Sequence, residues 1–172
     1  MAVEVHVVKH PLIADSLTRI RDVSTPNALF RQELERVGTL LIAEATRDLP
    51  TRKVRVTTPL VETDGHALSS QPVIVPVLRA GLGFVHAAQE LMPVIVLDPM
   101  LATGGSLAYA VHLLLERKPS GPIIVICVLA APEGIEYLEK AGLDLRIYTA
   151  SIDERLNENA FIVPGLGDSG DR

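Results

Sequence analysis

The stretch of this sequence best suited to chemistry is Asp98 to Ser106, DPMLATGGS. It follows an aliphatic run at 94–97 and precedes residues with helical periodicity, which predicts a strand, a short loop and a helix. Glycines let a backbone approach a ligand closely, and the N–H groups that open a helix suit a phosphate. Hydroxyls of Thr103 and Ser106 can donate to it, and Asp98 can accept hydrogen bonds from sugar hydroxyls. The segment predicts a sugar-phosphate site, although the same residues can also merely end a strand and cap a helix.

Two further glycine-containing segments are candidates for binding. The first, LRAGLG, closes another aliphatic run, and the guanidinium of Arg79 in it offers a planar fork to a diphosphate. The second, IVPGLGDSGD from Ile162, presents bare backbone groups that suit a small planar amide, and Asp168 in it could position a metal ion or a water. A solvated arginine in an ordinary turn and a flexible acidic tail are the competing interpretations.

Other reactive side chains are weaker candidates for a functional site. His6 and His10 are four residues apart, but the second precedes a proline and the first lies in an extended stretch, so no metal-binding face is expected. The cluster Asp153-Glu154-Arg155 is more typical of a solvated turn than of a site, and Cys127 lies within an apolar run that predicts core. The sequence contains no phosphate-binding loop of the GxxxxGK[ST] type, no Ser/His/Asp signature and no zinc-ligand spacing.

The elements that must position these residues alternate between strand and helix. Unbroken aliphatic runs suit interior strands of a parallel sheet covered by helices; they lie at 73–78, 94–97 and 123–130, with a weaker one at 145–150. Helical patterns lie between them at 82–91, 106–118 and 133–141. The alternation predicts an α/β doubly wound parallel sheet with ligands at the carboxyl ends of its strands.

The residues before this region predict an extended start, two helices and a hairpin. The first helix opens at His10-Pro11, and the second is capped at Ser24-Thr25-Pro26, with the proline at its first position, and ends near 48–50. Asp64-Gly65 is a hairpin turn signal between limbs at 54–62 and 66–69, so a β-arm over about 54–70 is expected. Its polar alternation suggests that it projects from the core or packs on another subunit.

Size and composition limit the classes of function. The chain has 172 residues and 48% hydrophobic residues, enough for one domain over 1–172 with a proper core. A net charge of −5 disfavours binding to nucleic acid or to an acidic membrane surface. One cysteine favours a reducing compartment, and no apolar run approaches the length of a membrane helix, so we expect a cytoplasmic protein.

The segment 98–106 resembles the 5-phosphoribosyl 1-diphosphate (PRPP) motif of the uracil phosphoribosyltransferases, type I phosphoribosyltransferases that carry Asp-Pro where most relatives have two acidic residues. Further similarity to that family lies in HPL at 10–12, ATRD at 45–48, PVLRAGLG at 76–83, APEG at 131–134, DERLNE at 153–158 and IVPGLGD at 162–168. The similarity spans nearly the whole chain.

The resemblance implies a role for each matching residue. Asp98 and Asp168 are the catalytic candidates, with Asp98 on the ribose hydroxyls and Asp168 facing the diphosphate. Binding of PRPP is expected from Arg79, Asp98, Pro99, Met100, Leu101, Ala102, Thr103, Gly104, Gly105, Ser106 and Asp168. Uracil is expected to contact Ile162, Gly167, Asp168 and Ser169, mainly through backbone groups. The expected cofactor is Mg²⁺ carried by PRPP; no protein residue is assigned as its direct ligand, and Asp168 could reach it through water.

The resemblance also implies the activity and the architecture. Uracil and PRPP are the expected substrates, and UMP and diphosphate the products. The family fold is a doubly wound parallel sheet with helices on both faces, a hood formed by the N-terminal and C-terminal segments, and a β-arm used in dimerisation. A homodimer or homotetramer, and GTP as an allosteric activator, are further expectations.

Three other functions stay open, and one departure from the family bears on the first of them. Family members carry a further strand, an Arg-Asp pair at the diphosphate and a mobile flap where this chain has only Met92-Pro93. A catalytically inactive nucleotide-binding module would fit such a loss. A pyrimidine-responsive RNA-binding regulator would use the same fold without catalysis. A transferase for another pyrimidine or for a purine would keep the enzyme class and change the base.

Overall fold

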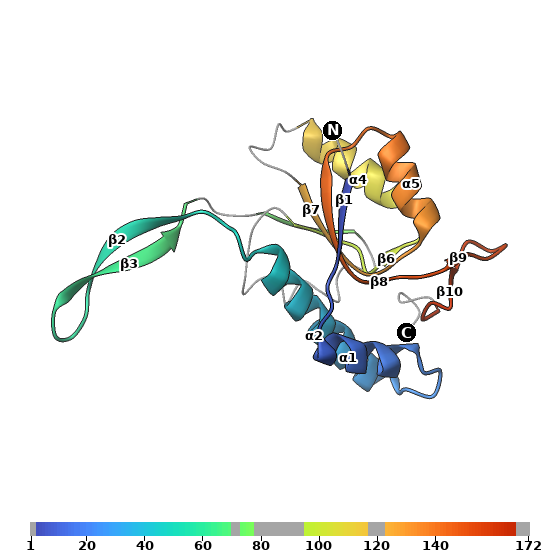
Figure 1. Ribbon diagram of the computed structural model, residues 1–172, viewed down its shortest axis with the longest axis horizontal. Helices are drawn as coiled ribbons and strands as arrows, with labels where there is room; N and C mark the ends of the chain where they lie inside the picture. The colour runs from blue at the N-terminus through green and yellow to red at the C-terminus, as the bar shows by residue number, and fades with distance from the viewer. Residues whose placement is uncertain (1–2, 70–72, 78–94, 117–122, 168–172) are drawn as a thin grey trace.

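The computed structural model describes residues 3–69, 73–77, 95–116 and 123–167, and their centre is a parallel sheet (Figure 1). Within these residues the strand order is β1-β8-β7-β5-β4, and β6 pairs with the end of β7. The strands are β1 (Val3–Val7), β4 (Ile74–Pro76), β5 (Ile95–Leu97), β6 (Met100–Leu101), β7 (Ile123–Ala130) and β8 (Leu145–Ile152). The four predicted runs all contain strands, and every pairing in this sheet is parallel.

Strand β7 shows why the sheet is covered on both faces. All eight of its residues are buried. Ile124, Ile126 and Val128 belong to one apolar cluster with the helices α1 (Pro11–Arg21) and α2 (Asn27–Ala45). The alternate residues Ile123, Val125 and Cys127 belong to a second cluster with α4 (Gly105–Leu115) and α5 (Pro132–Lys140). An aliphatic strand packed on both faces is what the unbroken run predicts, and the doubly wound fold is confirmed.

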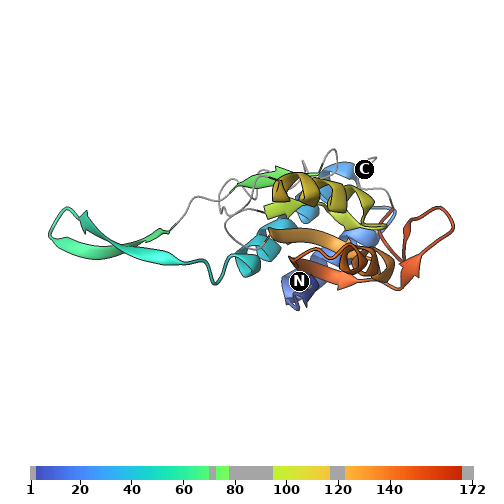
Figure 2. The same cartoon turned by 90° about the horizontal axis from the view of Figure 1, so that it is seen from above.

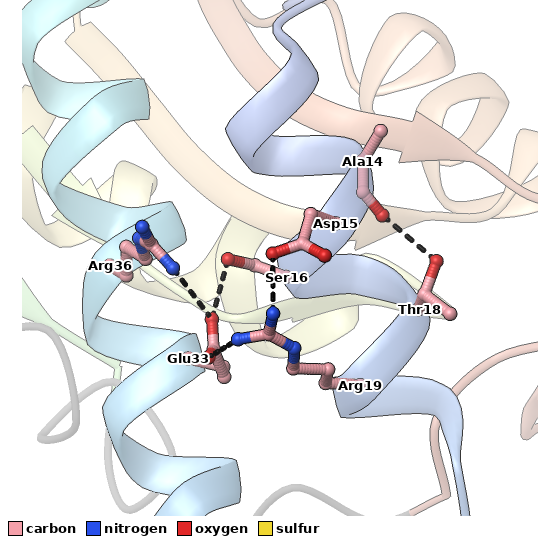
Figure 3. A network of polar contacts seen from close by, with 7 residues as sticks. All are labelled: Ala14, Asp15, Ser16, Thr18, Arg19, Glu33 and Arg36. Atoms are coloured by element: carbon pink, nitrogen blue, oxygen red, sulfur yellow. Dashed lines mark hydrogen bonds and ion pairs between the residues drawn. The ribbon is translucent and has the colours of Figure 1, made fainter.

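The helices α1 and α2 are joined by a buried carboxylate (Figure 3). Glu33 of α2 is 4% exposed, and its carboxylate accepts hydrogen bonds of 2.6 Å from Ser16 Oγ and from Arg19 Nη1 of α1. Arg36 adds an ion pair at 3.6 Å. The hydrogen bond from Ser16, followed by the contacts with Arg19, holds the pKa of Glu33 below its usual value despite burial. The carboxylate stays charged and fixes α1 against α2.

The predicted cap of α2 is wrong in its details. Pro26 occupies the capping position rather than the first helical one, and no side chain caps the helix. The hydroxyl of Ser24 donates to Asp22 Oδ1 at 2.7 Å, and that of Thr25 donates to the carbonyl of Arg19 at 2.6 Å. Both hydroxyls therefore secure the turn that follows α1. The opening of α1 is as predicted, with His10 Nδ1 accepting from the N–H of Leu12 at 3.1 Å.

A two-stranded hairpin projects away from the sheet in both views (Figures 1 and 2). Its strands β2 (Thr51–Thr57) and β3 (Glu62–Leu68) are antiparallel, and Thr57 pairs with Glu62. The turn lies at 58–61, so the predicted turn at Asp64-Gly65 and the limb boundaries drawn from it are wrong. The hydroxyl of Thr58 accepts from two turn N–H groups, which closes the turn there. Gly65 instead lies opposite Val54 inside β3.

The C-terminal segment contains a small hairpin that the sequence did not predict. Strands β9 (Arg155–Leu156) and β10 (Ile162–Val163) are antiparallel, where only a loop was expected from Ile162 onward. Each strand is two residues long, too short for any periodicity to show in the sequence. The predicted helix at 82–91 lies outside the described residues.

Candidate active site

A cavity of about 270 Å³ lies at the carboxyl end of β5, where the fold class predicts a ligand. It is lined on one side by the segment that follows β5 and on the other by residues around β10. The lining residues are Val77, Asp98, Met100, Leu101, Ala102, Thr103, Gly104, Ser106, Leu107, Ala160, Phe161, Ile162 and Gly167.

The segment 98–106, here called the phosphate loop, is bound to the sheet by backbone hydrogen bonds. The carbonyl of Pro99 accepts from the N–H groups of Val128 at 2.9 Å and Leu129 at 3.2 Å. The carbonyl of Leu101 accepts from Ala131 at 2.8 Å. These partners lie at the end of the fully buried β7 and the residue after it, so the loop begins from a rigid base.

The end of the phosphate loop forms an anion-binding geometry. Gly104 has φ +80°, which L side chains rarely adopt, and an added Cβ would lie 2.9 Å from the carbonyl oxygen of Gly134. Helix α4 starts at the next residue and has no acidic residue in its first turn. The first N–H groups of a helix lack partners within it, so the start of α4 favours an anion beside the exposed Thr103 and Ser106.

Asp98 is a titratable group in the cavity lining. Burial raises its pKa to about 6 because the charged form loses water, and a 3.3 Å hydrogen bond from the N–H of Met100 opposes that rise. Among the described residues no cationic side chain forms an ion pair with it. Its oxygens therefore have capacity to accept hydrogen bonds from a bound ligand.

The opposite wall is formed by the β9–β10 hairpin. Asn157 Oδ1 accepts from the N–H groups of Asn159 and Phe161, both at 2.9 Å, which closes the hairpin turn. Ala160 adopts φ +62° within this turn. The turn places Ala160 and Phe161 in the cavity lining, and sequence reasoning missed both. The two asparagines, Asn157 and Asn159, were the available signal for a turn, but alanine seldom adopts a left-handed conformation, so nothing marked Ala160 itself.

Asp153 anchors this hairpin, contrary to the prediction of a solvated turn. Its side chain is 2% exposed and forms an ion pair of 2.6 Å with Arg21 at the end of α1. It also accepts from Ser151 Oγ at 3.0 Å and from the N–H of Gly165 at 2.9 Å. The neighbours Glu154 and Arg155 are exposed, as expected. The charged cluster did not reveal a buried residue, because the partner that neutralises Asp153, Arg21, is 132 positions away in the chain.

The structure brings most of the predicted site residues together. Asp98, Met100, Leu101, Ala102, Thr103, Gly104, Ser106, Ile162 and Gly167 all line the cavity. Pro99 and Gly105 do not line it, since the first is buried against β7 and the second opens α4. Arg79, Asp168 and Ser169 lie outside the described residues.

The remaining reactive side chains lie away from the cavity lining. Cys127 is fully buried, and burial raises its pKa to about 12, which agrees with its predicted place in the core. His6 stacks on Tyr148, with ring centroids 4.8 Å apart. Within 3–69, 73–77, 95–116 and 123–167, no three His, Cys, Asp or Glu side chains gather in a way that could hold a metal. Over the same residues no helix has the length and apolarity needed to cross a membrane.

Comparison with known proteins identifies the family of this chain. The family model described as uracil phosphoribosyltransferase matches residues 7–95 and 92–172. The chain belongs to the uracil phosphoribosyltransferase family. Proteins named uracil phosphoribosyltransferase from Streptomyces griseus and Corynebacterium diphtheriae are 43% and 41% identical to it, over 98% of this chain and 96% and 95% of theirs. The resemblance in the sequence and the enzyme class, pentosyltransferase, are thereby confirmed.

A solved structure supports the fold independently. The AQ2163 protein from Aquifex aeolicus superposes with a TM-score of 0.91 at 30% identity, covering 97% of this chain and 96% of that one. The α/β phosphoribosyltransferase-like fold is confirmed by this match together with the parallel sheet.

The comparisons also show that this chain is shorter than its relatives in the middle. The two alignments run over 202 and 204 positions, so each has at least 30 positions, the excess over 172 residues, that this chain lacks. The two matches to the family model meet at 92–95. This is the place where Met92-Pro93 replaces the longer family segment.

Proposed function

We propose that this protein transfers the 5-phosphoribosyl group of PRPP to N1 of uracil, with UMP and diphosphate as products. In this reaction the bond from the anomeric carbon to the diphosphate oxygen breaks, the bond to N1 forms, and the N1 proton passes to solvent water. One observation carries the proposal: a single cavity joins the phosphate loop to Ile162 and Gly167. Membership of the uracil phosphoribosyltransferase family supports the same activity.

The phosphate loop is suited to the 5-phosphate of PRPP. The start of α4 offers backbone N–H groups to the anion, and Thr103 and Ser106 add hydroxyl donors around it. The positive φ of Gly104 turns the chain into α4 without a side chain in the way. In this proposal residues 102–106 bind the phosphate and fix the register of the donor.

Asp98 is suited to the ribose of the donor. It follows β5 directly and lines the same cavity as the phosphate loop. Its ionised carboxylate would accept hydrogen bonds from two ribose hydroxyls, and bringing the sugar to a fixed place lowers the entropic part of the barrier. The negative charge also stabilises the cationic character that develops at the anomeric carbon.

The β9–β10 hairpin is suited to uracil. Ile162 is buried at the cavity wall, and Phe161, which is 45% exposed, lines the same wall. Gly167 has φ +80° and nothing within 4 Å of an added Cβ, so its backbone is open to a planar ligand. The proposal includes Asp168 and Ser169 on uracil, and Arg79 on the diphosphate, as the family motifs imply.

The donor set fits a Mg²⁺ ion that arrives with the substrate. Among the described residues the cavity lining holds one carboxylate, Asp98, and two hydroxyls, which is too few for a site built from these side chains alone. Mg²⁺ often keeps several waters and binds substrate phosphates with only one or two carboxylates. When bound to the diphosphate of PRPP, the ion would neutralise charge on the leaving group.

The proposal extends to assembly, regulation and location. The tip of the β-arm exposes Leu60 at 95% and Val61 at 65%, an apolar end that packs well on a second copy. We therefore include a homodimer or homotetramer. Activation by GTP is included because the family resemblance implies it, and a cytoplasmic location because the single cysteine favours a reducing compartment. The Streptomyces and Corynebacterium relatives are named as enzymes, and the net charge of −5 gives no support to an RNA-binding regulator.

The test is product formation by the full-length chain. Uracil, cytosine, hypoxanthine and orotate are each incubated with PRPP and Mg²⁺, with and without GTP, and nucleotide and diphosphate are quantified. We expect UMP from uracil and no nucleotide from the other bases. No turnover of uracil, or preferred turnover of another base, would refute the proposal. Salt-dependent binding of a pyrimidine-operon leader RNA, in the absence of turnover, would favour an RNA-binding regulator instead.

A further inference from the structure

We propose that the first turn of α5, residues 132–134, is a positioning element that holds the phosphate loop and the β9–β10 hairpin at a fixed separation across the cavity. The inference rests on the proposed function, since it concerns the walls assigned there to PRPP and uracil. It concerns residues that are not among those lining the cavity.

Gly134 makes the contact with the phosphate loop. A Cβ added to Gly134 would overlap the carbonyl oxygen of Ala102 and would lie 3.2 Å from the Leu101 side chain. The approach is reciprocal, since a Cβ on Gly104 would meet the carbonyl of Gly134 at 2.9 Å. The backbones of loop and helix therefore touch directly, and only glycine permits this spacing.

Glu133 makes the contact with the hairpin. Its Oε1 accepts a hydrogen bond of 2.9 Å from the N–H of Leu156 in β9. Leu156 pairs in turn with Ile162 of β10, which lines the cavity. The same hydrogen bond is the main reason that the pKa of the exposed Glu133 lies below its usual value, so its carboxylate is charged at neutral pH.

The turn between these contacts is itself fixed to the core. Ala131 is fully buried, and its N–H donates to the carbonyl of Leu101 at 2.8 Å. Leu138, further along α5, is fully buried as well. Two adjacent residues of one anchored helix thus contact opposite walls of the cavity, so a displacement at either contact changes the distance between those walls.

Substitution of Gly134 should displace the PRPP wall. In Gly134→Ala the added methyl pushes the backbone of the phosphate loop away by an ångström or so, and misplacements of that size cost up to about 10²-fold in rate. We expect KM for PRPP to rise at least about tenfold, with KM for uracil changed less. Gly142→Ala is the control: Gly142 lies just after the same helix with φ +67°, so an alanine there strains the backbone, but nothing lies within 4 Å of the added Cβ and neither wall of the cavity is pushed.

Substitution of Glu133 should loosen the uracil wall. Glu133→Ala removes the acceptor for the N–H of Leu156, and loss of one such hydrogen bond should raise KM for uracil about threefold to tenfold. Glu133→Gln keeps a carbonyl acceptor and should restore most of the affinity. Glu136→Ala is the matched control, because Glu136 lies one turn later on α5 and pairs with Lys140.

The experiment measures both KM values and the amide hydrogen exchange of the full-length variants. We expect faster exchange at 100–107 in Gly134→Ala and at 155–163 in Glu133→Ala, with neither change in the controls. Equal effects of each variant on both KM values, or unchanged exchange in both segments, would overturn the positioning role. Failure of the wild-type chain to make UMP would refute the proposed function instead, and the exchange data would still decide whether the turn holds the two walls.

Discussion

The two walls of the cavity are built in different ways. The phosphate loop occupies nine consecutive residues, and its main hydrogen bonds are backbone bonds to the adjacent buried strand β7. The β9–β10 hairpin depends on side chains from elsewhere, since Arg21 and Asp153 are 132 positions apart and Glu133 and Leu156 are 23 apart. One wall is specified locally, and the other exists only when distant elements have come together.

This contrast predicts different consequences of mutation. The phosphate loop shares the stability of the core sheet, so changes in it should act mainly on binding and catalysis. The hairpin is held by a few hydrogen bonds at the edge of the molecule, which is typical of regions that open locally before the whole protein unfolds. Changes to the residues that anchor the hairpin, such as Asp153, should therefore lower the unfolding free energy before they affect binding.

The largest effect is expected at the hairpin anchor. Asp153→Ala leaves Arg21 and the N–H of Gly165 without their acceptor, and breaking a buried pair in this way costs about 3–5 kcal/mol. The lower end applies here because the Arg21 side chain is 28% exposed. Denaturant unfolding measures the loss. Asp153→Asn should lose less unfolding free energy, since an amide oxygen still accepts hydrogen bonds. An unfolding free energy of Asp153→Ala equal to that of wild type would contradict the idea that this wall depends on distant side chains.

The second effect tests the phosphate wall. Asp98→Asn keeps the shape of the side chain and removes the charge proposed to hold the ribose, so kcat should fall by about 10²-fold or more while the fold persists. Steady-state kinetics measure kcat, and circular dichroism shows whether the fold persists. The exposed Asp144→Asn serves as control and should behave as wild type. Turnover at the wild-type rate in Asp98→Asn contradicts the proposed role of Asp98.

A pH titration sharpens the same point. The pKa of Asp98 is raised from 3.8 to about 6, so the folded state keeps a proton that the unfolded state has lost between those values. The stability contributed by this group is present below pH 4, is lost as pH rises to about 6, and is constant above that. The loss amounts to about 2–3 kcal/mol.

The measurement is the difference in unfolding free energy between wild type and Asp98→Asn across pH 4–7. The difference cancels the opposite slope from carboxyls with lowered pKa, such as Glu33. A difference that does not change with pH would show that burial does not raise the pKa of Asp98. The same ionisation predicts that kcat/KM rises with pH up to about 6, because the charged form accepts hydrogen bonds from ribose.

The smallest effect on stability is expected in the β-arm, which has no core of its own. Leu60→Ser removes the most exposed apolar side chain among the described residues and should change the unfolding free energy by less than about 0.5 kcal/mol. If the arm tip packs on a second copy, the same change should lower the mass measured by light scattering. The control is Val23→Ser, because Val23 is similarly exposed, at 92%, but lies between α1 and α2 rather than in the arm. An unchanged mass for Leu60→Ser would remove the arm tip from the interface.

Sequence reasoning succeeded where a structure depends on neighbours in the chain. The run at 123–130 became β7 with the predicted boundaries, and the segment 98–106 connects β5 to α4 as predicted, although it also contains the short strand β6 and the first residues of α4. It failed at the arm turn, where Asp64-Gly65 is a strong local signal but the hydroxyl of Thr58 closes the turn earlier. Two local preferences competed there, and strand pairing decided between them.

The amino-acid sequence alone determined the α/β class, the strand-loop-helix unit of the phosphate site and the family. Each of these is recognised from short runs or motifs of neighbouring residues. Only the tertiary structure decided that Asp153 is buried, that Ala160 and Phe161 face the cavity, and that Glu133 and Gly134 touch its two walls. Burial and contact depend on which elements pack together, and no local pattern of residue types carries that information.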